Sequence, residues 1–421
     1  MIELALLGLL VVMVLMGSLA SVGWDTYEMR NRENWWWACV LGMECVLMYT
    51  QNPYLAVVLA FFAVGLWQIG RSWFILRGIV IPTAAMAGAY ILMVPYMGRW
   101  MVAPILWSFV AVGMALGVWG ILGYVNKQRP YNLVVPPSWF GMWGIYEHGE
   151  HRPYRHLCGQ GNTLHLSSVA SLTIAAGVGL IIMGQWWAVF CLPLCLVPLA
   201  LVYSQQVRHN DASNTNEPDP FHPGQGGMNL GVLAVGLQWL YYPLVAVCSA
   251  VLIVGGIITT LMIAKPWTKQ HKWMDSGRLA YWVDALRLVW WPAGWRRRLF
   301  GLGTSTWFVS TVRMAEQRKH VNVYTAAHNE FIQQLLEHGI IGFLALAVYV
   351  GEALWRTSHG GPEGAAVFLL GLTVCSIASV NFPFTFFHEY HPSTAKEESW
   401  YGSPTLNVLC FVVALLVEAI R

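Results

Sequence analysis

Charged side chains are scarce in this chain. They make up 11% of its 421 residues, whereas soluble domains carry about 25%. Hydrophobic residues make up 57%, so the composition argues against an ordinary soluble enzyme and indicates an integral membrane protein. The net charge is only +3, and no run of basic residues contains the polar side chains that could contact bases. Both observations argue against nucleic acid as a partner. The lipid bilayer is the first partner that the sequence implies.

Patterns for metals and disulfides are also missing. Of the eight cysteines, only Cys158 lies in a polar stretch. No CxxC or Cys–His spacing appears, so we interpret the cysteines as small apolar side chains. His388, Glu389 and His391 do not have the HExxH spacing of zinc enzymes. We therefore expect neither a metal nor a cofactor.

Apolar runs fill most of the chain and predict an all-α integral membrane protein with about twelve transmembrane helices, forming one polytopic domain over residues 1–421. The N-terminal run has no basic start and is interpreted as a first membrane helix instead of a cleaved signal. Residues 229–264 form two spans or one tilted helix, with a break expected at Pro243. The predicted spans are 2–22, 36–50, 53–70, 74–96, 101–123, 164–183, 185–203, 229–246, 247–264, 338–355, 364–381 and 404–420.

Three polar segments interrupt these runs, at 124–162, 204–228 and 265–337. With twelve spans all three lie on one face, and their arginines and lysines would place that face in the cytoplasm. If 229–264 is a single span, the third and largest segment moves to the opposite face. The spacing alone leaves both orientations open.

The segment 265–337 carries the features that suggest chemistry. SGRLAYWVDALRLVWWP has apolar residues at helical spacing, and Pro292 should end this short helix. The arginines at 296–298 form a dense cationic site. Gly301 and Gly303 allow either a tight turn or a close approach to a ligand.

A histidine follows in YTAAHNEFIQQLLEHGIIGF. We expect Thr325 to cap a helix whose first turn contains His328, with Gly339 as its stop. The positive end of the helix dipole would keep the imidazole neutral, as a general base requires. A histidine that only caps or packs is the alternative at this point.

The order of these features resembles the O-antigen ligase and polymerase superfamily. The matching pieces are Arg278 with Trp282, then GLGTSTWF, then HNEFIQQLLEHGIIG. Upstream, RHLCGQGNTLHLSSVASL is similar to a family segment that opens a membrane helix, with Arg155 and Gly159 matching. The resemblance implies a bacterial inner-membrane, multi-pass glycosyltransferase of the type C class, with its catalytic loop, 265–337, on the extracytoplasmic face.

The resemblance also implies the reaction and its residues. A glycan would pass from a polyprenyl (undecaprenyl) diphosphate carrier to an acceptor hydroxyl, such as that of a lipid A-core sugar. His328 would activate the acceptor, Arg278 and Arg155 would hold the diphosphate, and Glu337 would order the local helices. Asn329 and Gly303 would support the site. Neither a nucleotide sugar nor a metal is needed.

One departure concerns the diphosphate. The family carries a second arginine before its eighth span, and Gln225 stands at that place here. Arg208, earlier in the same polar segment, or Arg297 in the 296–298 cluster would have to substitute. Either would supply a guanidinium, which suits phosphate oxygens.

Other functions share parts of the pattern. A polysaccharide polymerase and a protein O-oligosaccharyltransferase belong to the same superfamily, but the arginine elements of polymerase outer loops are absent, which favours a ligase. A transporter or flippase would place ionisable groups inside the spans. Because Glu44 is nearly the only acid in the middle of a predicted span, the sequence favours an enzyme.

Overall fold

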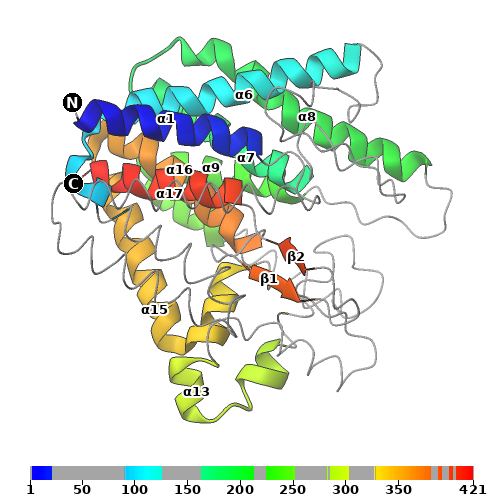
Figure 1. The fold of residues 1–421 in the computed structure, drawn as a ribbon, viewed down its shortest axis with the longest axis vertical. Coiled ribbons are helices and arrows are strands. Elements are labelled where there is room, and N and C mark those ends of the chain that lie inside the picture. The colour runs from blue at the N-terminus through cyan, green and yellow to red at the C-terminus, as the bar shows by residue number, and fades with distance from the viewer. Residues whose placement is uncertain are drawn as a thin grey trace.

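The structure, a computed structural model, is mostly helical (Figure 1). It describes residues 2–20, 90, 92–125, 163–212, 224–251, 282, 285–302, 327, 329–380, 387–390, 398–401 and 404–420. The α-helices are α1 (Ile2–Ala20), α6 (Val102–Val125), α7 (Thr163–Ile182), α8 (Ala188–Ala212), α9 (Gly224–Tyr241), α13 (Trp295–Phe300), α15 (Glu330–Ser358), α16 (Gly361–Val380) and α17 (Pro404–Ala419). Shorter elements are two 3₁₀ turns, η2 (Val94–Tyr96) and η3 (Arg99–Met101), the π-helix η6 (Ala285–Trp290), and the strands β1 (Phe387–Tyr390) and β2 (Glu398–Tyr401).

The helices follow the predicted apolar runs wherever the structure describes them. Runs such as 101–123 and 364–381 coincide with α6 and α16. α9 ends at Tyr241 and a new helical stretch begins at Pro243, so the predicted break is confirmed. The predicted spans 36–50 and 53–70, with most of 74–96 and 247–264, lie outside the described residues.

Three of the described helical stretches are long and apolar enough to cross a bilayer, namely Arg99–Leu122, Glu330–Ser358 and Gly361–Ser379. Large apolar side chains remain exposed on several helices, among them Leu244, Val348 and Phe190. Such a surface is expensive in water and suits a lipid environment. The chain is therefore a helical protein with helices fit to cross a membrane.

Two strands were not predicted. β1 pairs with β2 in antiparallel fashion, with Phe387 opposite Tyr401. The stretch around His388, for which no helix or strand was predicted, therefore belongs to a strand pair. The pair lies between α16 and α17 in the chain.

Helices α1, α6, α7, α16 and α17 lie side by side, with α8 and α9 packed against them (Figure 1). Their shared core is apolar and includes the fully buried Phe109, Leu106 and Leu172. α15 contacts α16 and slants away from this bundle, and α13 lies against its far end. The fold therefore holds the segment 285–302 away from the bundle core.

A buried polar triad joins three helices of the bundle. Asn229 of α9 donates to Ser171 of α7 at 3.0 Å, and Ser376 of α16 donates to the Asn229 side-chain oxygen at 2.7 Å. All three side chains are buried. Hydrogen bonds between helices matter in an apolar surrounding because no water is present to replace them.

A sharp kink divides α15. Gly339 has φ 70° and ψ −168°, so the helix from Glu330 ends there and a second helix continues to Ser358. The predicted helix stop at Gly339 is confirmed. Gly301, directly after α13, also has a positive φ, of 83°.

The two glycines form a joint between α13 and α15. A Cβ on Gly301 would overlap the Glu337 carbonyl, and one on Gly339 would overlap the Leu299 carbonyl. Leu302 N–H donates to the Leu336 carbonyl at 3.1 Å. The backbones of α13 and α15 are thus in direct contact, and only glycine, which has no Cβ, permits so close an approach.

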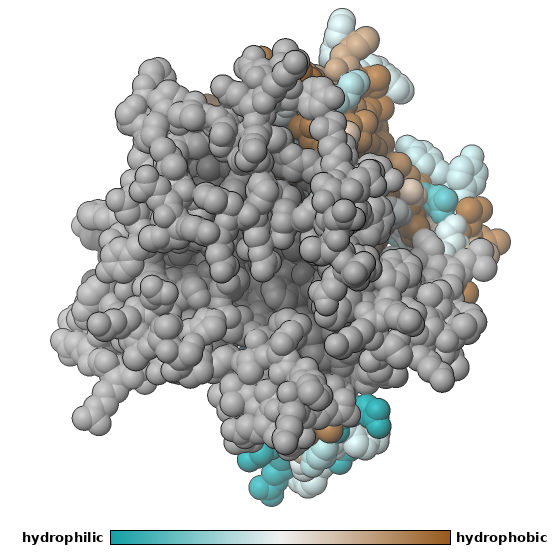
Figure 2. All heavy atoms as spheres, turned by 90° about the vertical axis from the view of Figure 1, so that its right-hand side faces the viewer, coloured by the Kyte–Doolittle hydropathy of each residue, from teal (hydrophilic) through white to brown (hydrophobic). Residues whose placement is uncertain are grey.

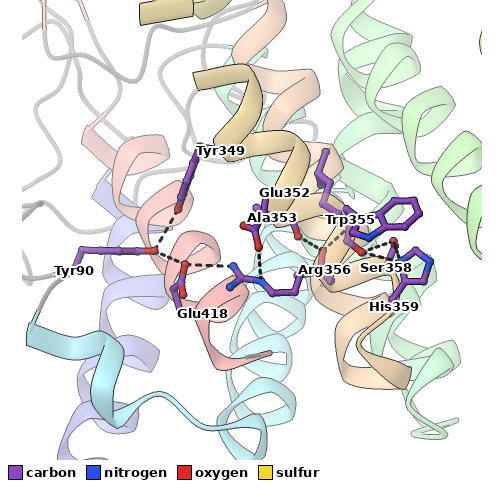
Figure 3. A network of polar contacts seen from close by, with 11 residues as sticks. Tyr90, Tyr349, Glu352, Ala353, Trp355, Arg356, Ser358, His359 and Glu418 are labelled. Atoms are coloured by element: carbon purple, nitrogen blue, oxygen red, sulfur yellow. Dashed lines mark hydrogen bonds and ion pairs between the residues drawn. The ribbon is translucent and has the colours of Figure 1, made fainter. Parts of the chain in front are cut away.

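The opposite end of α15 is held by a polar network (Figure 3). Glu418 of α17 is buried, accepts from Tyr90 at 2.5 Å, and pairs with Arg356 at 3.4 Å. Tyr90 also lies 3.3 Å from the Tyr349 hydroxyl, and Glu352 lies 3.6 Å from Arg356. α15 is thus connected to the last helix of the chain.

We predict that Ser376→Ala lowers the free energy of unfolding in detergent by about 1 kcal/mol, because Asn229 loses a donor from a neighbouring helix. Ser108→Ala is the matched control. Its hydroxyl is equally buried but bonds only to Ile105 in its own helix. Equal losses in the two variants would contradict a role for the triad in joining the helices.

We predict that Gly339→Ala destabilises the joint by roughly 1–3 kcal/mol from backbone conformation alone, with the overlap in addition. Hydrogen exchange should rise in α13 and in residues 330–338. Gly351→Ala is the control on the same helix, because nothing lies within 4 Å of a Cβ there and alanine favours the helix. Unchanged exchange in Gly339→Ala would show that the joint is not needed.

Candidate functional site

Three separated pieces of the predicted catalytic loop meet in one small cluster. Its buried centre is Ala285 of η6, Ala327 and Leu336 of α15. Partly buried residues pack around this centre, namely Trp282, Leu288, Val289, Trp290, Leu302 and Ile332. The segment ending at Pro292, Leu302 and the first part of α15 are therefore brought together, as their grouping in the sequence suggested.

A chain of hydrogen bonds organises this cluster. Trp282 donates its indole N–H to the Ala327 carbonyl at 2.6 Å. The Ala327 N–H donates to the Gln333 side-chain oxygen at 3.3 Å, and Gln333 donates to Glu337 at 3.2 Å. Gln333 and Glu337 are buried. Both backbone groups of Ala327 are thus fixed by side chains from two elements.

Asn329 begins α15. Its side chain accepts from the Ile332 N–H at 2.9 Å, which makes it the N-cap. The prediction that Thr325 caps the helix was therefore wrong, and the helix begins at Glu330. Asparagine caps at least as well as threonine. With Asn329 as the N-cap, His328 lies just before the helix and not in its first turn.

His328 itself lies outside the described residues, but its two neighbours do not. Ala327 is held by Trp282 and Gln333, and Asn329 is held by its cap. The chain on both sides of the histidine is thus anchored to the cluster. The predicted supporting residues Asn329 and Glu337 both belong to it.

The arginines at 296–298 lie on α13. Arg296 stacks on Trp295, with its Cζ 5.4 Å from the ring centroid, and Arg298 stacks on Trp291 at 5.8 Å. Arg297 is exposed. No carboxylate in the described part of the chain forms an ion pair with these guanidinium groups. The helix therefore presents positive charge next to the joint with α15.

The remaining predicted residues are not brought to this cluster by anything described. Arg278, Arg155 and Gly303 lie outside the described residues. Arg208 falls near the end of α8, and Gln225 in the first turn of α9. Whether Arg208 or Arg297 replaces the missing arginine stays a prediction.

Sequence reasoning missed the central role of Gln333. The signal was present, because Asn329, Gln333 and Glu337 recur every four residues and so share one helix face. A polar stripe of this kind beside an apolar one predicts a buried network. The pair of Arg356 and Glu418 was missed as well, because each lies near the end of an apolar run.

Chemically, the cluster contributes a rigid polar helix start, and α13 adds a group of cations at the joint. The cations suit an anionic group, and the anchored stretch around position 328 suits a side chain that must be held in place. No family model and no curated protein matches the chain in the comparisons made with known proteins.

Proposed function

We propose that the chain is a membrane glycosyltransferase that moves a glycan from a polyprenyl diphosphate carrier to an acceptor hydroxyl. A ligase with a lipid A-core sugar as acceptor is the preferred form. The observation that carries the proposal is the joint between α13 and α15. It holds α13, with its three arginines, against Leu336–Gly339, the far end of the helical segment whose ordered start directly follows His328.

His328 acts as the general base in the proposed reaction. It removes the proton of the acceptor hydroxyl, whose oxygen forms a bond to the anomeric carbon of the glycan. The bond from that carbon to the carrier oxygen breaks, and the polyprenyl diphosphate leaves with the electron pair. Because the leaving group gains negative charge, nearby guanidinium groups lower the barrier.

Arg297 is the described arginine best suited to the diphosphate. It is exposed, and among the described rings none stacks on it, whereas Arg296 and Arg298 each contact a tryptophan. Arg278 and Arg155 are further diphosphate contacts in this proposal. Arg297 would then compensate for Gln225, where the resemblance would place an arginine.

The membrane helices support a lipid-linked substrate. The segment of α15 after Gly339 continues from the cluster into a stretch apolar enough to cross a bilayer. The arginines of α13 would therefore lie at the depth where the diphosphate of a bilayer-held carrier leaves the apolar layer. Glu337, buried and bonded to Gln333, keeps the helix start in register with the joint.

The decisive experiment is complementation of a bacterial strain that lacks its own O-antigen ligase. We predict that the chain restores the glycan ladder and that His328→Ala lowers transfer by about 10²–10⁴-fold, the usual contribution of a general base. Membrane insertion and amount of protein should be unchanged. Full glycan transfer by the His328→Ala variant would contradict the proposed mechanism.

His359→Ala is the matched control, since this exposed histidine lies at the opposite end of the same helix. It should transfer as the wild type does. A ladder restored only in a strain lacking a polymerase, or glycan found only on protein, would favour the sister activities. Lipid flipping without transfer would favour a flippase.

A second prediction concerns orientation. Arg287→Cys, placed on η6 in a background without the eight native cysteines, should react with a membrane-impermeant thiol reagent added from the extracytoplasmic side. Arg287 is exposed and is not one of the aromatic residues of this segment, so the thiol would be accessible. Labelling from the cytoplasm only would refute the proposed enzyme, because the carrier's glycan is presented on the outer face.

A further inference from the structure

We propose that η6, α13 and their connecting turn form a seat on the bilayer surface that selects anionic phospholipid headgroups. The seat consists of Trp291, Trp295 and Phe300 with Arg296 and Arg298. It is a separate role from the diphosphate contact assigned to Arg297. The inference does not depend on the proposed transferase activity.

The aromatic side chains of the seat are exposed to an unusual degree. Trp291 is 67%, Trp295 62% and Phe300 64% exposed, all within ten positions of the chain. Large aromatic rings that remain exposed are costly in water but favourable at the headgroup level, where tryptophan gathers. Exposure of this kind therefore needs a partner.

The charges of the seat identify that partner. Two tryptophans each carry a stacked guanidinium, at 5.4 Å for Arg296 and 5.8 Å for Arg298. A ring that sinks into the interface would bring its arginine to the level of the phosphates. No carboxylate from the described chain competes for these charges. The complementary surface is anionic and partly apolar, as a bilayer with acidic lipids is.

The position in the fold agrees with this assignment. In Figure 2 teal side chains border pale and brown ones at the lower end, where Figure 1 places α13. The joint at Gly339 fixes α13 to the start of the helix that is apolar enough to span the membrane. A segment attached rigidly at that point would lie at the level where the span leaves the bilayer.

The test replaces Trp295 with the photo-crosslinker p-benzoylphenylalanine in the full-length protein. The protein is placed in nanodiscs of phosphatidylcholine with a minority of phosphatidylglycerol. After irradiation, mass spectrometry of the peptide identifies the crosslinked lipid. We expect phosphatidylglycerol to be enriched about fivefold over its share of the bilayer.

Two kinds of control separate charge from simple proximity. Arg296→Gln with Arg298→Gln should reduce the enrichment to the bulk ratio, and the corresponding lysine pair should retain it. The crosslinker at Trp187, which is 76% exposed and has Phe190 as its ring neighbour, should show no preference for phosphatidylglycerol.

Two outcomes would overturn the inference. One is crosslinking of position 295 to lipids in their bulk ratio in the wild-type background. The other is a lack of lipid adducts altogether, with crosslinks to protein in their place, which would show that the seat faces another polypeptide. Arg297→Gln should leave the lipid ratio unchanged, whatever it does to glycan transfer.

Discussion

The backbone contact between Gly301 and Gly339 determines where the rest of the candidate site can be. Gly301 approaches the Glu337 carbonyl and Gly339 approaches the Leu299 carbonyl with no Cβ in between, and the bond from Leu302 to Leu336 completes the joint. A methyl group at either glycine would separate α13 from α15. Because α13 carries the arginines and α15 carries the polar helix start, their separation would remove the arrangement on which the proposed function depends.

α15 is held at both ends by interactions of different kinds. At its start, Asn329, Gln333 and Glu337 form a side-chain network with Ala327. At its other end, Arg356 pairs with the buried Glu418. The two contacts lie on opposite sides of the Gly339 kink, so each of the two helical parts of α15 has its own polar anchor. The same pair would be costly to break, since Glu418 without Arg356 would be a buried charge.

Apolar runs predicted the helices well because burial against lipid and against other helices both require long apolar stretches. Pro243 and Gly339 were also predictable, since their backbone limits act locally. The start of α15 was placed too early, because Thr325 and Asn329 are both good caps and spacing cannot choose between them. What favours Asn329 is partly tertiary, namely the bond that Trp282 makes to Ala327 from a distant part of the sequence. Such a long-range partner leaves no local signal.

The arrangement of cations also follows from the joint. A lipid-linked diphosphate must be met at the edge of the bilayer, because its charge cannot enter the apolar layer and its chain cannot leave it. Arginines on a flexible loop would meet it only at an entropic cost, as each would have to be ordered on binding. Placing Arg297 on a short helix that is locked to α15 at the Gly339 kink removes most of that cost in advance. The two stacked pairs, Arg296 with Trp295 and Arg298 with Trp291, would hold that helix at the required depth.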